Sequence, residues 1–184
     1  MTFFKNLHDW QPTRGVVLFI LFSVLSGRPL PVLAEIPVLK KSGQATAYWA
    51  GLIPVYDAQL WVSDITTYPN LLSDQTPLRL ELCYHVALSK ENFIKAAKKG
   101  LPNPLSPSHI EAVNQLHLAY ENVTAGDCYQ LSYDAMNGTQ LRLNNQLKFQ
   151  TKTPGFKTLY FGLWLGQHPL SDTVKTTLLK GLLK

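Results

Sequence analysis

Few side chains in this sequence have the types and spacing that chemistry requires. His109 and His117 are eight residues apart with Glu111 between them, and that spacing does not build a metal site on one helix. His85 follows Cys83 by two residues, but i,i+2 neighbours that point the same way on a strand seldom form a nucleophile–base dyad. We therefore expect structural roles for these residues, with no metal site and no bound cofactor.

The first 34 residues have the order of a secretory signal peptide. Lys5 and Arg14 precede the uncharged run Gly15–Ser26, and Val32 and Ala34 follow with the small-x-small spacing of a cleavage site. The run is short for a membrane span, and no later segment is long enough to cross a bilayer. We predict a signal peptide at 1–34, a single domain at 35–184, and a periplasmic or secreted protein. An uncleaved anchor is the alternative.

Cys83 and Cys128 are the only cysteines, and both lie beyond the predicted signal peptide. An exported protein meets an oxidising compartment, so an even pair of cysteines is a candidate disulfide. Each cysteine lies on the more polar face of its predicted strand, where a bridge is sterically feasible. The sequence favours a Cys83–Cys128 bond, and two free buried thiols are the alternative.

The charge of the chain gives little support for a nucleic-acid partner. Residues 35–184 carry 14 Lys and Arg against 11 Asp and Glu. Lys95, Lys98 and Lys99 gather within about one helical turn, but no aromatic side chains are interleaved with them and arginine is scarce. We interpret this group as a solvated helix face, and we expect no nucleic-acid binding.

The hydrophobic periodicity predicts an α+β domain. Residues 35–43 are expected to be a polar lead-in, and residues 47–62 to form either two strands joined by a tight bend or one bulged strand. The other predicted elements are a strand at 78–85, helices at 89–100 and 108–122, a strand at 128–134, and one or two helices within 154–184. A hairpin turn at Asn137-Gly138 leads to a partner strand through Leu141 and Leu143, and Asn144-Asn145 is expected to turn again before a strand at 147–149. Ser89 and Ser171 are the expected helix caps. This order favours an antiparallel sheet with helices over one face.

Several short words in the sequence occur in the order found in one known family. They are Val55–Trp61, the run LELCYHVALSKENFIKAAKKGL from Leu80, Gly126-Asp127, Asn137–Thr139 and, most specific, Tyr160–Ser171. Together they resemble the bacterial, exported branch of the chalcone isomerase-like family, over about residues 40–183. The resemblance implies an open-faced β-sandwich, in which a large antiparallel sheet packs against a layer of helices with a cleft between them. In the plant enzymes this cleft closes a chalcone to a flavanone without a cofactor, and non-catalytic relatives hold a fatty acid there.

The family's polar residues mostly have no counterpart here. The position of its arginine falls near Lys40–Ala45, where Lys41 is a weaker substitute that lacks the planar guanidinium fork. Its catalytic tyrosine would lie within residues 101–109, which contain Leu105 and no tyrosine. Two threonines correspond to Tyr56 and Leu163. We therefore take Tyr56, Lys41, Leu105 and Leu163 as candidate cleft residues without assigning a catalytic role to any of them.

Ring closure needs hydrogen-bond donors aimed at a developing enolate, and these substitutions remove most of them. The cleft is expected to be apolar and to lie between the sheet and the helices at 91–100 and 108–122. Arg79 and Arg142, the only arginines after residue 34, are expected to point away from the core. The sequence therefore favours a non-catalytic protein that binds a fatty acid or another apolar small molecule. The alternatives are an intramolecular lyase with an unknown substrate and an assembly protein with a filled cleft. The natural ligand, protein partners and oligomeric state stay open.

Export should leave a mature chain that starts at Glu35, because signal peptidase cuts after the small-x-small pair that ends at Ala34. Intact-mass analysis of the exported protein measures this directly. A retained N-terminus would contradict the prediction.

Overall fold

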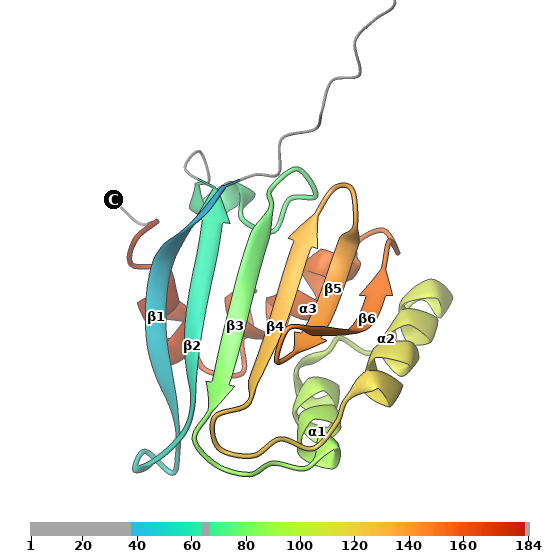
Figure 1. The fold of residues 1–184 in the computed structure, drawn as a ribbon. Coiled ribbons are helices and arrows are strands. Elements are labelled where there is room, and N and C mark those ends of the chain that lie inside the picture. Colours follow the sequence, from blue (N-terminus) through green and yellow to red (C-terminus); the bar gives the residue numbers. More distant parts are fainter. Residues whose placement is uncertain (1–37, 64–66, 183–184) are drawn as a thin grey trace, which may run out of the picture. The chain divides into compact units, whose positions relative to one another are not determined.

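A computed structural model describes residues 38–63 and 67–182. They form a six-stranded antiparallel sheet in the order β1-β2-β3-β4-β5-β6, with helices on one face (Figure 1), which confirms the predicted fold class. The strands are β1 Leu39–Trp49, β2 Ile53–Ser63, β3 Leu78–Tyr84, β4 Cys128–Asp134, β5 Gly138–Leu143 and β6 Gln146–Thr151. The helices are the 3₁₀ turn Tyr68–Asn70, α1 Lys90–Gly100, α2 Pro107–Ala119, α3 Phe156–Leu165 and α4 Asp172–Leu178. The predicted signal peptide lies outside the described residues.

The strand at the centre of the sheet shows the alternation that its sequence predicts. Leu78, Leu80, Leu82 and Tyr84 of β3 are buried, whereas the residues between them are half-exposed. The partner strand β4 continues the same buried face, with Leu80 opposite Leu131. Because side chains alternate across a strand, one face of the sheet joins the core and the other carries the polar residues and the cysteines.

The edge of the sheet corrects one expectation. Residues 39–43, predicted to be a polar lead-in, are the first part of β1, which pairs with β2 as far as Ser63. The strand signal is weak because an edge strand is half-exposed and its register is interrupted between Lys41 and Gly43. Gly43 is needed at this point, since a Cβ there would lie 2.0 Å from the Leu178 carbonyl oxygen of α4. Helix α4 therefore packs closely on β1 at Gly43.

The helices begin where the sequence places their caps. The Ser89 backbone amide donates to Asn92 Oδ1 at 2.9 Å at the start of α1, and Ser171 Oγ accepts from the Val174 amide at the start of α4. Helix α2 ends at Ala119, earlier than the predicted Asn122. Helix α4 packs on β1 and β2, α3 on β5, and α2 on β6. In the described residues, no helix is both long and apolar enough to cross a membrane.

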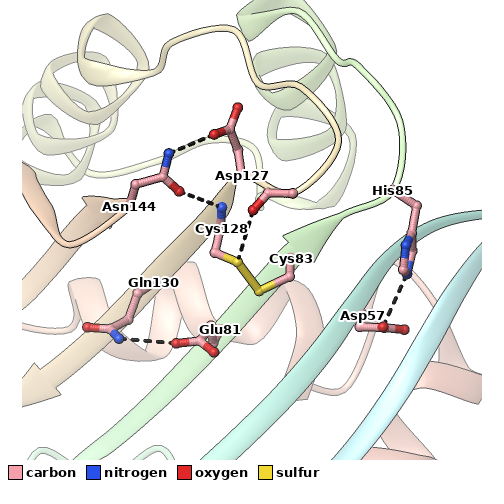
Figure 2. The surroundings of a disulfide bond; sticks show 9 residues. Asp57, Glu81, Cys83, His85, Asp127, Cys128, Gln130 and Asn144 are labelled. Atoms are coloured by element: carbon pink, nitrogen blue, oxygen red, sulfur yellow. Dashed lines mark hydrogen bonds and ion pairs between the residues drawn. A yellow bond between two sulfur atoms is a disulfide. The ribbon is translucent and has the colours of Figure 1, made fainter.

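Helices α1 and α2 form an excursion of the chain between β3 and β4, and the excursion is closed at its base. Cys83 and Cys128 lie opposite each other, 4.1 Å apart at Cα, and form the predicted disulfide (Figure 2). Backbone hydrogen bonds from Tyr84 N to Asp127 O and from Gly126 N to Tyr84 O continue the pairing by one step. Leu88 and Val123 then exchange two more. The chain therefore leaves the sheet and returns to it at the same place.

Replacing both Cys83 and Cys128 with alanine should lower the free energy of unfolding by about 3–4 kcal/mol, since the bond closes a loop of sequence separation 45. Urea denaturation measures the loss. The unmodified protein should show the same loss in a reducing agent, and the double variant should not respond to the reductant. Equal stability of variant and unmodified protein would contradict a structural bond.

Candidate functional site

A cavity of about 190 Å³ lies between the sheet and the helix layer. Its floor comes from β2 to β5, and its other walls come from α1, α3 and Tyr120 at the end of α2. The lining residues are Val55, Tyr56, Leu82, Tyr84, Leu88, Asn92, Phe93, Ala96, Ala97, Tyr120, Tyr129, Leu131, Leu141, Tyr160, Leu163, Trp164 and Leu170. Three of them, Asn92, Ala96 and Leu170, are exposed, and we call these three the cavity mouth.

Tyrosine hydroxyls supply most of the polarity of this cavity. Tyr120 and Tyr160 are hydrogen-bonded to each other through their hydroxyls at 2.8 Å, so the pair uses one of its two protons internally. The Tyr56 hydroxyl accepts from Trp164 Nε1 at 3.3 Å and keeps its own proton. Tyr129 is used structurally, because its hydroxyl donates to the Glu121 carbonyl and accepts from the Glu121 amide. The cavity can therefore offer phenolic protons to an acceptor on a ligand.

Burial keeps these phenols neutral. Desolvation of the charged form raises the pKa of Tyr56, and it raises the pKa of Tyr84 and Tyr160 well above the ordinary value of 10.0. Desolvation also raises the pKa of Tyr120, although its hydrogen bond with Tyr160 opposes the shift. A phenol whose pKa lies above 10 is a donor at neutral pH and not a general base. The site has hydroxyls that can orient a ligand and no phenolate that can activate one.

Stacked aromatic rings fix the positions of these hydroxyls. The Phe93 ring of α1 lies 5.4 Å from the Tyr84 ring, 5.2 Å from Tyr120 and 5.5 Å from Tyr129, measured between centroids. These contacts join α1 to β3, β4 and the end of α2, and edge-to-face geometry between rings adds to their area of burial. The walls of the cavity are therefore held by packing and not only by the backbone.

No charged side chain lines the cavity in the described part of the chain. Both arginines lie elsewhere: the Arg79 guanidinium stacks 4.5 Å from the Trp61 ring centroid, and Arg142 donates to the Asn145 carbonyl at 3.0 Å. A carboxylate inside the cavity would have no cation to pair with, and burying an unpaired charge is expensive. The site favours neutral groups.

The family model for chalcone isomerase-like proteins matches residues 39–180. This chain belongs to the chalcone isomerase-like family. Among solved structures it is similar to a fatty-acid binding protein of Arabidopsis thaliana, with a TM-score of 0.60 and 11% sequence identity, over 77% of this chain and 86% of that one. A search of curated proteins finds no significant match. At this identity the structural likeness shows the fold alone.

The four predicted cleft residues fall in three places on this chalcone isomerase-like fold. Tyr56 and Leu163 line the cavity from β2 and α3. Leu105 lines a separate open groove instead, and Lys41 lies on the exposed edge strand, where its ammonium donates to Gln44 at 3.2 Å. Lys41 thus lines neither hollow, because β1 is the far edge of the sheet from β4 and β5.

The wall opposite the sheet differs from the expectation. The helices at 91–100 and 108–122 were predicted to enclose the cleft, but α3 takes the place of most of α2 through Tyr160, Leu163 and Trp164. Tyr84, Tyr120, Tyr129 and Tyr160 were not anticipated as lining residues, so the cavity carries more hydroxyls than expected, although that of Tyr129 is engaged with Glu121. Tyr84 and Tyr129 could have been found from their place on the apolar face of alternating strands. Tyr160 has no such signal, since α3 is apolar on nearly all sides.

The open groove has a volume of about 940 Å³ and runs between the α1–α2 connection and α3. Leu105, His109 and His168 line it. His109 Nε2 is 2.9 Å from the Pro154 carbonyl oxygen, which ties α2 to the start of α3. No group of three or more His, Cys, Asp or Glu side chains capable of holding a metal ion occurs among the described residues.

Among the residues that the structure describes, Lys157 is the one buried lysine, with an exposed fraction of 1%, and no sequence pattern predicted its burial. Lys157 lies in the first turn of α3. Its Nζ donates to the carbonyl oxygens of Ser73 and Thr76, and it lies 4.7 Å from the centroid of the Tyr133 ring. These contacts occupy the ammonium and fasten the β2–β3 connection onto α3. Burial lowers the pKa of Lys157 to about 8, although nearby Asp74 opposes the shift.

This lowered pKa predicts a pH dependence of stability. Between about 8 and the ordinary value of 10.5, the unfolded chain binds a proton that the folded chain does not, so the free energy of unfolding should rise with pH. The rise should be roughly 1 kcal/mol over the first pH unit above 8. Urea denaturation should show it in the unmodified protein and in the exposed control Lys152→Met, but not in Lys157→Met. Parallel pH curves for the unmodified protein and Lys157→Met would contradict this assignment.

Proposed function

We propose that this chalcone isomerase-like protein binds an apolar small molecule in the tyrosine-lined cavity and does not catalyse a reaction on it. The observation that carries the proposal is a cavity of about 190 Å³ whose polar groups are neutral phenols, an amide and an indole, with no charged side chain in its described lining. The similar plant structure is named a fatty-acid binding protein, which supports an apolar ligand for this fold. An apolar wall with a few placed donors is the usual composition of a small-molecule site.

The ligand is compact and uncharged in its buried part. A cavity of roughly 150 Å³ in another protein holds one benzene molecule, so this one suits a single ring or a short chain. An acid could enter in its protonated form, or it could leave its carboxylate at the cavity mouth, in water. A carbonyl or ether oxygen would accept the protons that Tyr56 and the Tyr120–Tyr160 pair have free.

Two other functions have less support. An intramolecular lyase needs a base or an oxyanion stabilised by aimed donors, and the buried phenols here have raised pKa values and are partly engaged with each other. An assembly protein with a filled cleft conflicts with the size of the cavity that remains between the side chains. Binding is the function that uses the cavity as it stands.

We further propose that the protein works outside the cytoplasm. The sequence pattern of residues 1–34 supports export, and a disulfide that closes the main excursion of the chain suits an oxidising compartment. A carrier of apolar molecules in an aqueous compartment is a coherent role for such a protein.

Ala97→Leu tests the binding site. Ala97 is buried in α1 and lines the cavity, so a leucine there should occupy ligand volume without breaking the helix. We expect an apolar fluorescent probe to bind the unmodified protein with saturation and Ala97→Leu to bind it roughly tenfold or more weakly, given the apolar volume lost. Titration of probe fluorescence measures both.

Ala87→Leu is the matched control, because Ala87 is exposed and does not line the cavity. It should bind the probe as the unmodified protein does. Equal binding by Ala97→Leu would contradict the assigned site. Cyclisation of a chalcone above the spontaneous rate, if abolished in Tyr56→Phe, would contradict the non-catalytic function and favour the lyase.

A further inference from the structure

The hairpin between β1 and β2 exposes an unusual group of apolar side chains. Tyr48, Trp49, Leu52 and Ile53 have exposed fractions of 57%, 66%, 83% and 46%. They are neighbours in the chain, and residues 47–56, AYWAGLIPVY, contain no charged side chain. We call residues 48–53 the hairpin tip. Single exposed apolar residues are common on protein surfaces, but a contiguous group of large ones marks an interaction site.

The backbone presents these side chains at the end of a tight turn. Leu52 N donates to Trp49 O at 3.1 Å, and Ala50 and Gly51 between them have φ values of 51° and 74°. Both central residues are therefore left-handed, as in the turns that fit the twist of a two-residue hairpin. Pairing of Trp49 with Ile53 and of Tyr48 with Pro54 continues the ladder to the turn. The hairpin tip is therefore an ordered turn that joins two paired strands.

The hairpin tip and the start of α1 lie at the same end of the sheet. Antiparallel pairing places the β1–β2 turn beside the end of β3, where His85 N donates to Val55 O at 2.9 Å. The chain enters α1 five residues later, and Figure 1 shows both at the lower end of the sheet, the turn below β1 and β2 and α1 below β4 and β5. Val55 and Tyr56, directly after the tip, line the cavity. A surface held against the tip is therefore close to the site proposed for the ligand.

Unpaired positive charge occurs at this same end. Lys90, Lys95, Lys98 and Lys99 of α1 are exposed and form no ion pair within the described residues, and Glu91 is the helix's single acidic residue. The nearby acidic side chains are engaged: Asp57 with His85 at 3.1 Å, Glu121 with Lys148 at 2.6 Å and Asp127 with Asn144 at 2.7 Å. The hydrogen bond from the neutral Asn144 amide does not cancel the charge of Asp127, but four lysines against Glu91 leave α1 itself positive, and this helix complements an anionic surface.

We propose that the hairpin tip docks the protein onto an anionic lipid bilayer, with the lysines of α1 against the headgroups. Tryptophan and tyrosine partition to the membrane interface because one part of each ring system is apolar and another is polar. The two aliphatic side chains add buried apolar area, and the lysines add attraction to anionic lipid. An uncharged tip and the lysines of α1 at the same end of the sheet match a membrane surface on both counts. Docking does not require the proposed ligand, but it would let an apolar ligand pass between the bilayer and the cavity without crossing water.

Vesicle sedimentation tests the docking. The chain from Glu35 onward is suitable, since residues 36–184 form a compact unit with their own core and the apolar run at 15–26 would itself bind lipid. We expect binding to phosphatidylcholine vesicles that contain phosphatidylglycerol and weaker binding to phosphatidylcholine alone. The double variant Trp49→Ser/Leu52→Ser should bind the anionic vesicles roughly tenfold or more weakly, given the interfacial area removed.

Two further variants separate the apolar and the electrostatic contributions. Leu118→Ser/Met136→Ser removes two exposed apolar side chains, 86% and 62% exposed, from α2 and the β4–β5 turn, and it should bind as the unmodified protein does. Lys95→Gln/Lys99→Gln should weaken binding to anionic vesicles and reduce its dependence on salt. Brominated lipid should quench tryptophan fluorescence in the unmodified protein and lose that part of the effect in Trp49→Phe. Thermal unfolding checks that every variant is folded.

The outcomes are decisive in either direction. No vesicle binding by the unmodified protein, or equal binding by the tip variant, overturns the proposal. A dimer in size-exclusion chromatography that the tip variant converts to a monomer also overturns it, because the tip would then be a protein interface. Ala97→Leu should still bind vesicles, so failure of the ligand-binding proposal and failure of the docking proposal give different results.

Discussion

The closed base of the α1–α2 excursion is the constraint on which the site depends. Forty-odd residues leave the central strand of the sheet and return to its neighbour, and without a fixed base their two helices could not hold a fixed position. The disulfide, the paired backbone around Tyr84 and Asp127, and the Leu88–Val123 bridge provide that base. Phe93 then reaches the sheet from α1, and its ring contacts set the width of the cavity.

The protonation of the cavity's hydroxyls follows from the fact that they belong to tyrosine side chains. Its hydroxyls belong to tyrosine rings that also pack in the core. Burial removes water from these hydroxyls, which raises the pKa of Tyr84 and Tyr160 and keeps them protonated. A family whose enzymes need aimed donors thus provides, in this member, donors that are partly used on one another. The same residues thus stabilise the core and supply the hydroxyls of the cavity, and the protons of Tyr56 and of the Tyr120–Tyr160 pair that are not donated within the protein face a ligand.

The sequence predicted best where a single physical signal dominates. Alternation on β3 and β4, the Asn144-Asn145 turn and the caps at Ser89 and Ser171 are local signals. The disulfide was predicted from an even pair of cysteines and an expected oxidising compartment, because the sequence does not give the strand register that places them opposite each other. The site was only partly predictable because it depends on which helix covers which strand, and α3 carries no amphipathic pattern that tells its buried side from its exposed one. The first residues of strand β1 were predicted to be a loop, because the polar composition of this edge strand, with two lysines and a glycine, is typical of a loop. Lys157 gave no signal, since only the fold brings the Ser73 and Thr76 carbonyls to its ammonium.

The position of the disulfide also decides how the molecule would respond to a protease. The connection between α1 and α2, residues 101–106, is mostly exposed, and it lies inside the covalent loop that joins Cys83 to Cys128. A single cut there would produce two polypeptides, but each would carry one partner of the bond. The fragments would stay together on the same sheet, β1 to β3 contributed by one and β4 to β6 by the other, and would separate only after reduction and unfolding. The Cys83–Cys128 disulfide thus links the two halves of the sheet, β1 to β3 and β4 to β6, covalently.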